Sequence, residues 1–193
     1  MGASGVLGQA VLSALAGHEI IGASRAGEHK VDLREPDSIA ALYAAVGKVD
    51  AVACAAGVTP FKPFRDLALA DYRSGIDDKL LGQIELVRQG VEHVVDGGSF
   101  TLISGILVAE AIETGTVAAA VNGGVEAFVR AAATGLPRGQ RINAVSPTAF
   151  TETWDDYAPY FPGFVPVPAA DAGRAYAKSV GGVQTGQVYR VGY

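Results

Sequence analysis

Short apolar segments alternate with helical patterns along most of the chain, and this alternation limits the possible folds more than any other feature of the sequence. The apolar segments are continuous, which is typical of strands buried on both faces of a parallel sheet that helices cover. The expected strands are residues 18–23, 30–33, 49–55, 99–104, 141–146 and 187–191, and the expected helices are residues 6–16, 36–46, 71–95, 117–136 and 169–180. A turn at Asp96–Gly98 closes the longest helix. The sequence therefore predicts one α/β domain over residues 1–193, a doubly wound, Rossmann-like sandwich of three layers.

Composition excludes several other classes of protein. Hydrophobic residues make up 49% of the 193 residues, which is enough for a substantial core. The net charge of -5 argues against a nucleic-acid partner, which would require clustered Lys and Arg. No apolar run is long enough to predict a membrane span. The lone Cys54 is expected to be a buried thiol, and we expect a cytoplasmic protein.

A glycine-rich segment comes immediately before the first expected helix. Its glycines are spaced by three, at Gly2, Gly5 and Gly8. Such glycines permit a tight turn and bare the backbone N–H groups at the helix start, where a diphosphate can bind. The expected cofactor-binding residues here are Gly2, Ser4, Gly5, Val6, Leu7 and Gly8.

The hydrophobic strand that should lead into this turn is not in the sequence, because only Met1 precedes Gly2. In a doubly wound sheet that strand is central, and its loss leaves two neighbours with unpaired backbone groups. We expect that a short apolar strand is missing upstream. The alternative is that the glycines form a disordered N-terminus.

The end of the second expected strand indicates which dinucleotide is bound. It runs into Ser24 and Arg25, with no acidic residue to bind the ribose hydroxyls of NAD(H). A guanidinium suits a 2′-phosphate, so NADP(H) is the preferred cofactor and NAD(H) the alternative. Arg25 could also be an ordinary solvated arginine.

Several motifs in this order resemble the short-chain dehydrogenase/reductase family over nearly the whole chain. They are the glycine segment, Val31–Leu33, Cys54–Gly57, Leu102–Gly105, Arg141–Pro147 and Thr185–Val191. The resemblance implies that Asp32 and Leu33 lie at the adenine, and that Ala55, Ala56 and Gly57 line the cofactor. It also implies that Pro147 and Thr148 meet the nicotinamide, and that Ser104 is the catalytic serine.

The family's catalytic Tyr and Lys, one helical turn apart, are absent. The resemblance places Ala118 at the tyrosine and Asn122 at the lysine, and no Tyr or Lys occurs between Gly105 and Gln140. Lys79 stands where the family usually has a catalytic asparagine. One hypothesis is a rearranged site in which Ser104 binds a carbonyl, Lys79 supplies the proton, and Asn122 holds the ribose.

The sequence thus favours an NADP(H)-dependent oxidoreductase of a small carbonyl or alcohol compound. The alternative is a non-catalytic NADP(H)-binding protein with a regulatory or interaction role. The scattered histidines His18, His29 and His93 predict no metal site. An aromatic segment at residues 148–168 is either a lid over the site or a packed surface loop. The small residues of the helix at 117–135 predict a homodimer or homotetramer, with a buried intramolecular contact as the alternative.

Overall fold

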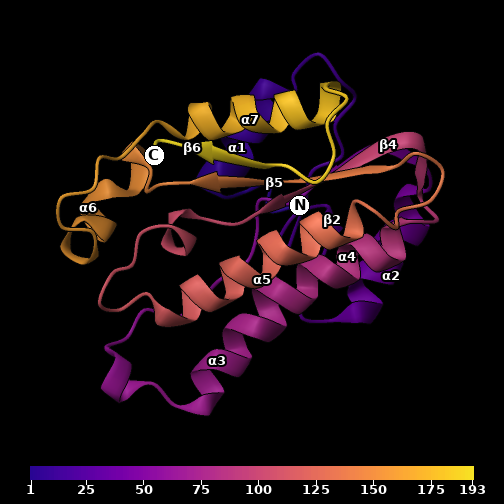
Figure 1. Ribbon diagram of the computed structural model, residues 1–193. Helices are drawn as coiled ribbons and strands as arrows, with labels where there is room; N and C mark the ends of the chain where they lie inside the picture. Colours follow the sequence, from indigo (N-terminus) through magenta and orange to yellow (C-terminus); the bar gives the residue numbers. More distant parts are fainter.

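The main sheet has four parallel strands in the order of the chain. The computed structural model describes residues 1–193. Strands β3 (Val49–Ala53), β4 (Val94–Ile103), β5 (Arg141–Pro147) and β6 (Val188–Val191) lie side by side in this order, and Figure 1 shows the last three of them. All three strand pairs are parallel. This confirms the predicted α/β fold with a parallel sheet.

Helices cover both faces of this sheet (Figure 1). One face carries α1 (Val6–Ala14) and α7 (Ala169–Gly181), and the other carries α2 (Pro36–Val46), α4 (Gly82–Gly90) and α5 (Thr116–Ala132). Each face has its own core. Val11 and Tyr176 are buried on the first face, and Ile39, Leu86 and Val125 on the second. The single Cys54 is a free, buried thiol as expected.

The predicted helix at residues 71–95 is three elements. α3 (Leu69–Gly75) continues into a π-helical segment, η2 (Ile76–Leu81), and then into α4, which ends at Gly90. β4 already begins at Val94, so the predicted turn at 96–98 lies inside that strand. There Gly97 has a φ of +73°, and the pairing register with β3 shifts. The glycines that predicted a turn therefore lie in an irregular part of β4, where its pairing with β3 is interrupted.

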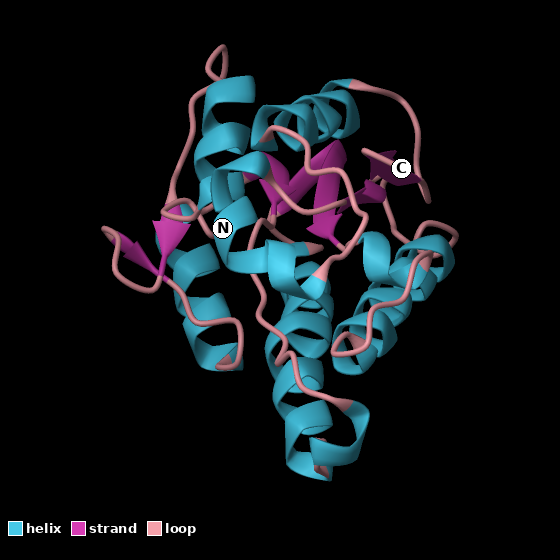
Figure 2. Ribbon diagram, turned by 90° about the vertical axis from the view of Figure 1, so that its left-hand side faces the viewer, coloured by secondary structure: helices cyan, strands magenta, loops and turns pink.

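The predicted strands at residues 18–23 and 30–33 are mostly wrong. Only β1 (Ala23–Ser24) and β2 (His29–Lys30) form, as a separate two-stranded sheet to one side of the main one (Figure 2). Residues 18–22 have no strand partner and are exposed, because no strand lies between them and β3. The glycine segment is nevertheless an ordered turn, in which Gly5 N donates to Gly2 O at 3.1 Å. The alternative of a disordered N-terminus is therefore wrong.

The aromatic segment at residues 148–168 is packed against the molecule. It contains α6 (Trp154–Tyr157) and the 3₁₀ turns Thr151–Thr153 and Ala158–Tyr160. Phe161 is buried and its ring centroid lies 6.3 Å from that of Phe61. Two further 3₁₀ turns, Phe64–Asp66 and Ile106–Val108, lie in the loops after β3 and β4.

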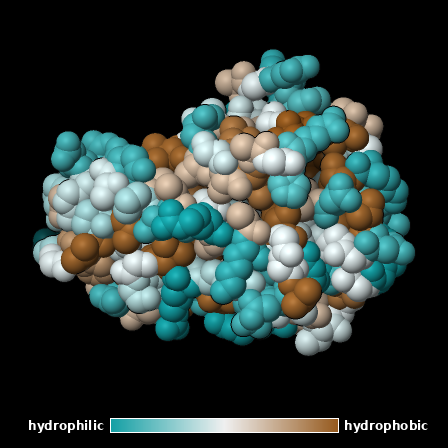
Figure 3. Space-filling view, turned by 90° about the horizontal axis from the view of Figure 1, so that it is seen from above, coloured by the Kyte–Doolittle hydropathy of each residue, from teal (hydrophilic) through white to brown (hydrophobic).

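The surface over α7 mixes hydrophilic and hydrophobic residues, and the hydrophobic ones reach it in several separate places (Figure 3). None of the helices combines the length and the apolar character that crossing a bilayer requires.

Candidate active site

The N-terminus of α1 presents free backbone amides. The N–H groups of Val6, Leu7 and Gly8 donate to no backbone carbonyl, and no side chain caps the helix. A Cβ on Gly8 would lie 1.9 Å from Gly2 O, so only glycine permits this turn to pack against the helix. An N-terminus with no acidic residue in its first turn attracts anions. This geometry fits the predicted diphosphate site.

The segment after β3 forms a second wall of the site. A Cβ on Gly2 would lie 2.5 Å from Ala55 O, so the glycine turn lies directly against Ala55. Gly57 has a φ of +131°, and a Cβ there would lie 2.5 Å from Cγ of Lys79. The structure thus brings Ala55, Ala56 and Gly57 between the glycine turn and Lys79.

Lys79 is a buried cation without a carboxylate partner. Its side chain comes from the π-helical segment, and its Nζ donates one hydrogen bond, to Ser104 O at 3.1 Å. Burial lowers the pKa of Lys79 to about 8, although Cys54 and Asp78 act in the opposite direction. Gln83 holds the same region by donating to Lys79 O and Ile103 O. A buried lysine that titrates near neutrality is typical of functional sites.

The Ser104 hydroxyl points into the protein. It donates to Oε1 of Glu126 at 2.9 Å, and Glu126 is 4% exposed. Only the backbone carbonyl of Ser104 faces Lys79. The structure therefore brings Ser104 and Lys79 together, but through the main chain of Ser104.

Two buried polar atoms near these residues have no hydrogen-bond partner. They are Oδ1 of Asn122 and Oγ1 of Thr148. The amide of Asn122 lies close to Gly105, where a Cβ would be 3.0 Å from Nδ2, and Pro147 O lies 3.8 Å from the same point. Unsatisfied buried polar atoms are rare, so these two are available to a ligand.

The predicted adenine-side residues lie at the edge of the small sheet. Ser24 ends β1, and Arg25 is exposed beside it. Side-chain hydrogen bonds from Arg34 lower the pKa of Asp32 to about 2, and Arg34 Nη2 lies 2.6 Å from its carboxylate. Leu33 is buried under Gly82. The bond from Ala3 N to Ala23 O joins this group to the glycine turn.

Comparison with known proteins identifies the family. A family model described as enoyl-(acyl carrier protein) reductase matches residues 11–181. The chain belongs to the short-chain dehydrogenase/reductase family.

Several known proteins are similar to the chain. The crystal structure of the protein lin1944 from Listeria innocua is 46% identical, with a TM-score of 0.96, and the match covers 98% of this chain and 96% of that one. A small-chain dehydrogenase in complex with NADPH is 23% identical with a TM-score of 0.80, over 98% and 93% of the two chains, and shows the same fold. Hydroxynaphthalene reductase arp2 of Aspergillus fumigatus is 27% identical over 120 residues, which are 61% of this chain and 44% of that protein. The matched region thus spans less than half the length of that curated relative.

Sequence reasoning missed one tyrosine near the short-chain dehydrogenase/reductase site. Tyr193 follows β6, and its hydroxyl lies 2.5 Å from Oγ of Ser146. Ser146 in turn donates to Glu126 Oε1 at 3.3 Å, and Arg130 lies 3.0 Å from the other carboxylate oxygen. A chain of hydrogen bonds therefore runs from Tyr193 through a buried carboxylate to the exposed Arg130. The sequence carries no signal for this, because the four residues come from α5, from β5 and from the segment after β6.

The adjacent carboxylates at residues 77 and 78 differ in their surroundings. Asp77 is exposed, but Asp78 accepts a hydrogen bond from Val58 N at 2.9 Å. Asp78 therefore ties the loop after β3 to the π-helical segment that carries Lys79.

Proposed function

We propose that this chain is an NADP(H)-dependent reductase or dehydrogenase of small carbonyl or alcohol compounds, in which Lys79 donates or accepts the proton. When bound, the nicotinamide cofactor supplies or takes the hydride. The chain's own residues then have to orient the substrate, exclude water and move one proton. The observation that carries this proposal is the buried Lys79 ammonium, which has one backbone acceptor and no counter-ion.

The described residues fit three parts of the cofactor: its diphosphate, its nicotinamide ribose and its carboxamide. The backbone N–H groups of Val6, Leu7 and Gly8 suit the diphosphate, because they donate to no backbone carbonyl. The partnerless oxygens of Asn122 and Thr148 suit the nicotinamide ribose and carboxamide. The complex of a structural relative with NADPH is consistent with this cofactor.

Lys79 can supply a proton because its pKa of about 8 lies close to neutrality. The Ser104 carbonyl accepts a hydrogen bond from the Lys79 ammonium. Gly57 packs against the lysine side chain, and the Gln83 amide donates to the Lys79 carbonyl. Ser104 would therefore position Lys79, and its hydroxyl could bind a substrate carbonyl only after leaving Glu126.

Replacing the lysine tests this assignment. We expect Lys79→Met to lower kcat at least about 100-fold, which is typical of a lost general acid. The affinity for NADPH, measured by fluorescence titration, should change less than about threefold, because chemistry rather than binding is lost. The pH profile of kcat/KM should also lose the limb with an apparent pKa near 8.

The matched control is Lys178→Met, which removes an exposed lysine on α7 whose Nζ lies 4.9 Å from the ring centroid of Tyr189. Activity should first be sought by screening carbonyl compounds for oxidation of NADPH. Unchanged turnover in Lys79→Met would show that another group, such as Tyr193, moves the proton.

The second candidate function is NADP(H) binding without turnover. It is favoured by Ala118 and Asn122 at the family's tyrosine and lysine positions, and by the commitment of the Ser104 hydroxyl to Glu126. NADPH binding with no oxidation across a broad carbonyl panel would support this candidate over the enzyme.

The preference for NADP(H) rests on Arg25, which is exposed directly after β1, whose last residue, Ser24, is not acidic. We expect Arg25→Ala to raise the Kd for NADPH about tenfold and to leave the Kd for NADH nearly unchanged, since only NADPH carries the 2′-phosphate. Calorimetric titration with both nucleotides measures this. Equal weakening of the two would remove the basis for the preference.

A further inference from the structure

Residues 191–193 lie against the turn that follows β5. Thr148 in this turn donates its N–H to Val191 O at 2.9 Å. Gly192 packs on the Thr148 side chain, because a Cβ on Gly192 would lie 2.6 Å from Cγ2 of Thr148. Its φ of +90° also favours glycine at this position. The segment therefore contacts the residue whose Oγ1 is buried without a hydrogen-bond partner.

One hydrogen bond anchors the end of this segment. Gly192 and Tyr193 form no backbone hydrogen bonds, and the Tyr193 hydroxyl lies 2.5 Å from Oγ of Ser146. Ser146 donates its single hydroxyl proton to Glu126, so Tyr193 is the donor in its bond with Ser146. Burial raises the pKa of the Tyr193 phenol, which keeps it protonated and able to donate at neutral pH.

The anchor is part of a buried network. Ser146 is fully buried, and Glu126 is 4% exposed. The Glu126 carboxylate also accepts a hydrogen bond from the Ser104 hydroxyl and pairs with Arg130. Hydrogen bonds that end on a buried charge are stronger than bonds between neutral groups. The Tyr193 hydroxyl is therefore fixed, through Ser146, to the same carboxylate as the Ser104 hydroxyl.

Three other tyrosine hydroxyls have partners far from this turn in the sequence. Tyr43 and Tyr176 donate to backbone carbonyls, and Tyr189 donates to Gln184 Oε1 at 3.0 Å. Tyr189 lies in β6, only four residues before Tyr193, and its hydroxyl bond is exposed. It therefore provides a matched control for the loss of a tyrosine hydroxyl.

We propose that Tyr193 is a positioning residue, which holds Thr148 in place to bind the nicotinamide end of the cofactor. This inference rests on the NADP(H) binding proposed above. The partnerless Oγ1 of Thr148 can accept a hydrogen bond from the carboxamide N–H. Without the Tyr193 anchor, residues 191–193 would no longer be fixed against the turn. The cofactor would then have to order the turn itself, which weakens binding.

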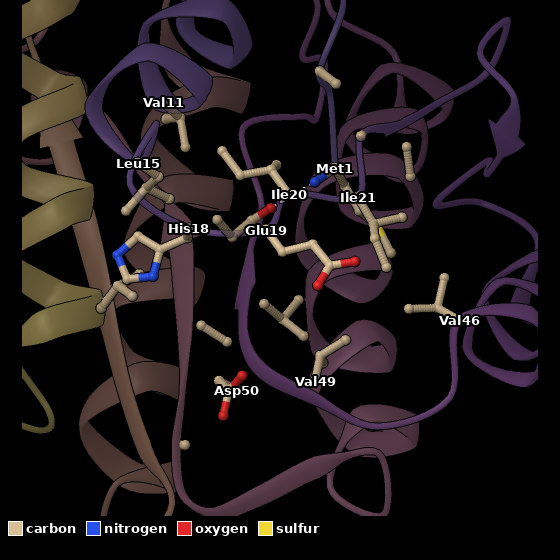
Figure 4. Close-up of a pocket in the computed structure, with 18 of the residues that line it drawn as sticks. Met1, Val11, Leu15, His18, Glu19, Ile20, Ile21, Val46, Val49 and Asp50 are labelled. Carbon is tan, nitrogen blue, oxygen red and sulfur yellow. Dashed lines mark hydrogen bonds between the residues drawn. The ribbon is translucent and has the colours of Figure 1, made fainter.

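The large groove of the molecule takes no part in this arrangement. Its volume is about 720 Å³, and Figure 4 shows Ile20, Ile21 and Val49 turned toward it. It lies beside β3, at the opposite edge of the main sheet from β6. Residues 146–148 and 191–193 are not among those that line it. The strand at this edge therefore serves as a reference for any general loosening of the fold.

Tyr193→Phe tests the proposal, because it removes the anchor and keeps the ring. We expect it to raise the Kd for NADPH about fivefold, which is typical of one lost hydrogen bond. The Kd for 2′-phospho-ADP-ribose, which lacks the nicotinamide, should stay nearly unchanged. Calorimetric titration measures both, and the control Tyr189→Phe should change neither. Ser146→Ala removes the acceptor of the same bond, so adding Tyr193→Phe to it should cause little further loss.

Hydrogen exchange without nucleotide gives a second measurement. The Thr148 amide should exchange at least about tenfold faster in Tyr193→Phe. The Cys54 amide, which donates to Thr101 O at 2.8 Å at the end of β3, should exchange at an unchanged rate. Unchanged exchange at Thr148 and an unchanged Kd for NADPH would overturn the proposal, and so would equal weakening of the two nucleotides. A wild type that binds neither nucleotide would overturn the proposed NADP(H) binding, and this inference with it.

Discussion

Among single residues, Lys79 combines burial with charge in a way that links stability to pH. Its ammonium bonds the carbonyl of Ser104, its side chain packs against Gly57, and the neighbours that favour its charged form are Cys54 and Asp78. Glu126 is also buried nearby, but its carboxylate is committed to Ser104, Ser146 and Arg130. The charge on Lys79 is therefore poorly compensated.

This arrangement predicts the direction of a pH effect. The pKa of Lys79 is about 8 in the folded chain and 10.5 in the unfolded chain. Between these values the unfolded chain binds more protons, so the free energy of unfolding rises with pH in this window. Relative to Lys79→Met, the wild-type chain should gain up to about 3 kcal/mol from pH 8 to pH 10.5.

Urea unfolding of the two proteins without nucleotide measures this difference at each pH. The difference isolates Lys79, because the other titrating groups are shared by both chains. A flat difference across the window would mean that water reaches the Lys79 ammonium.

Sequence reasoning predicted which residues lie close together better than it predicted their orientations. It predicted that Lys79, Ser104 and Asn122 share one site, and in the structure Ser104 has hydrogen bonds to both of the others, through its carbonyl to Lys79 and through its hydroxyl to Asn122 O. It could not foresee that the Ser104 hydroxyl faces Glu126, because a strand residue's side depends on the register of the whole sheet. The contribution of Tyr193 depends on the path of the chain after β6 and has no local pattern.

At the scale of elements, the sequence predicted regular helices closely and irregular ones poorly. α2 begins at Pro36 and buries Ile39 and Leu42, as its 3.6-residue pattern indicates. The π-helical segment was missed, because its apolar residues continue the pattern of the helices on either side. Gly75 and Gly82 flank it, and a Cβ on either would collide, with Val117 and with Leu33 respectively.

This π-helical segment matters for the site because it sets where Lys79 points. π-helical turns within helices are rare and occur frequently at functional sites. Here the segment lies between two glycines that allow close packing, and Asp78 within it holds the loop after β3. The same element thus positions both the lysine and the segment at Ala55–Gly57.

The small sheet shows why a correct local pattern can fail. The run from Ile20 to Ala23 has the composition of a buried strand, but strand formation needs a neighbour. Only Ala23 and Ser24 have a neighbouring strand, which is β2. The carbonyl of Ala23 also accepts a hydrogen bond from Ala3 N. β1 and β2 therefore have only two residues each, and the bond from Ala3 to Ala23 joins them to the N-terminal turn.

At the scale of the whole molecule, helix α5 presents two different faces. Gly124 packs against Leu80 of the same chain, where a Cβ would lie 2.8 Å from its Cδ2. For this part of the helix, the small residues therefore serve a contact within one chain, which was the alternative to an interface between copies. Gly123 has no atom within 4 Å of its Cβ position, and Ala120, Ala127 and Ala131 beside it are exposed. Small exposed residues on one helical face permit a second helix to approach closely.

We therefore keep the prediction of a homo-oligomer and assign its contact to the exposed face of α5. Gly123→Arg should leave the fold of the single chain intact, because the added side chain meets open space. In a symmetric dimer each copy would add one arginine to the same contact, so that steric overlap and like charge both oppose association. Sedimentation at micromolar concentration should show a dimer for the wild type and a monomer for Gly123→Arg. Ala40→Arg, on the exposed side of α2, is the matched control and should remain dimeric. A wild-type chain that sediments as a monomer would contradict the prediction, and the small residues of α5 would then serve only the contact with Leu80.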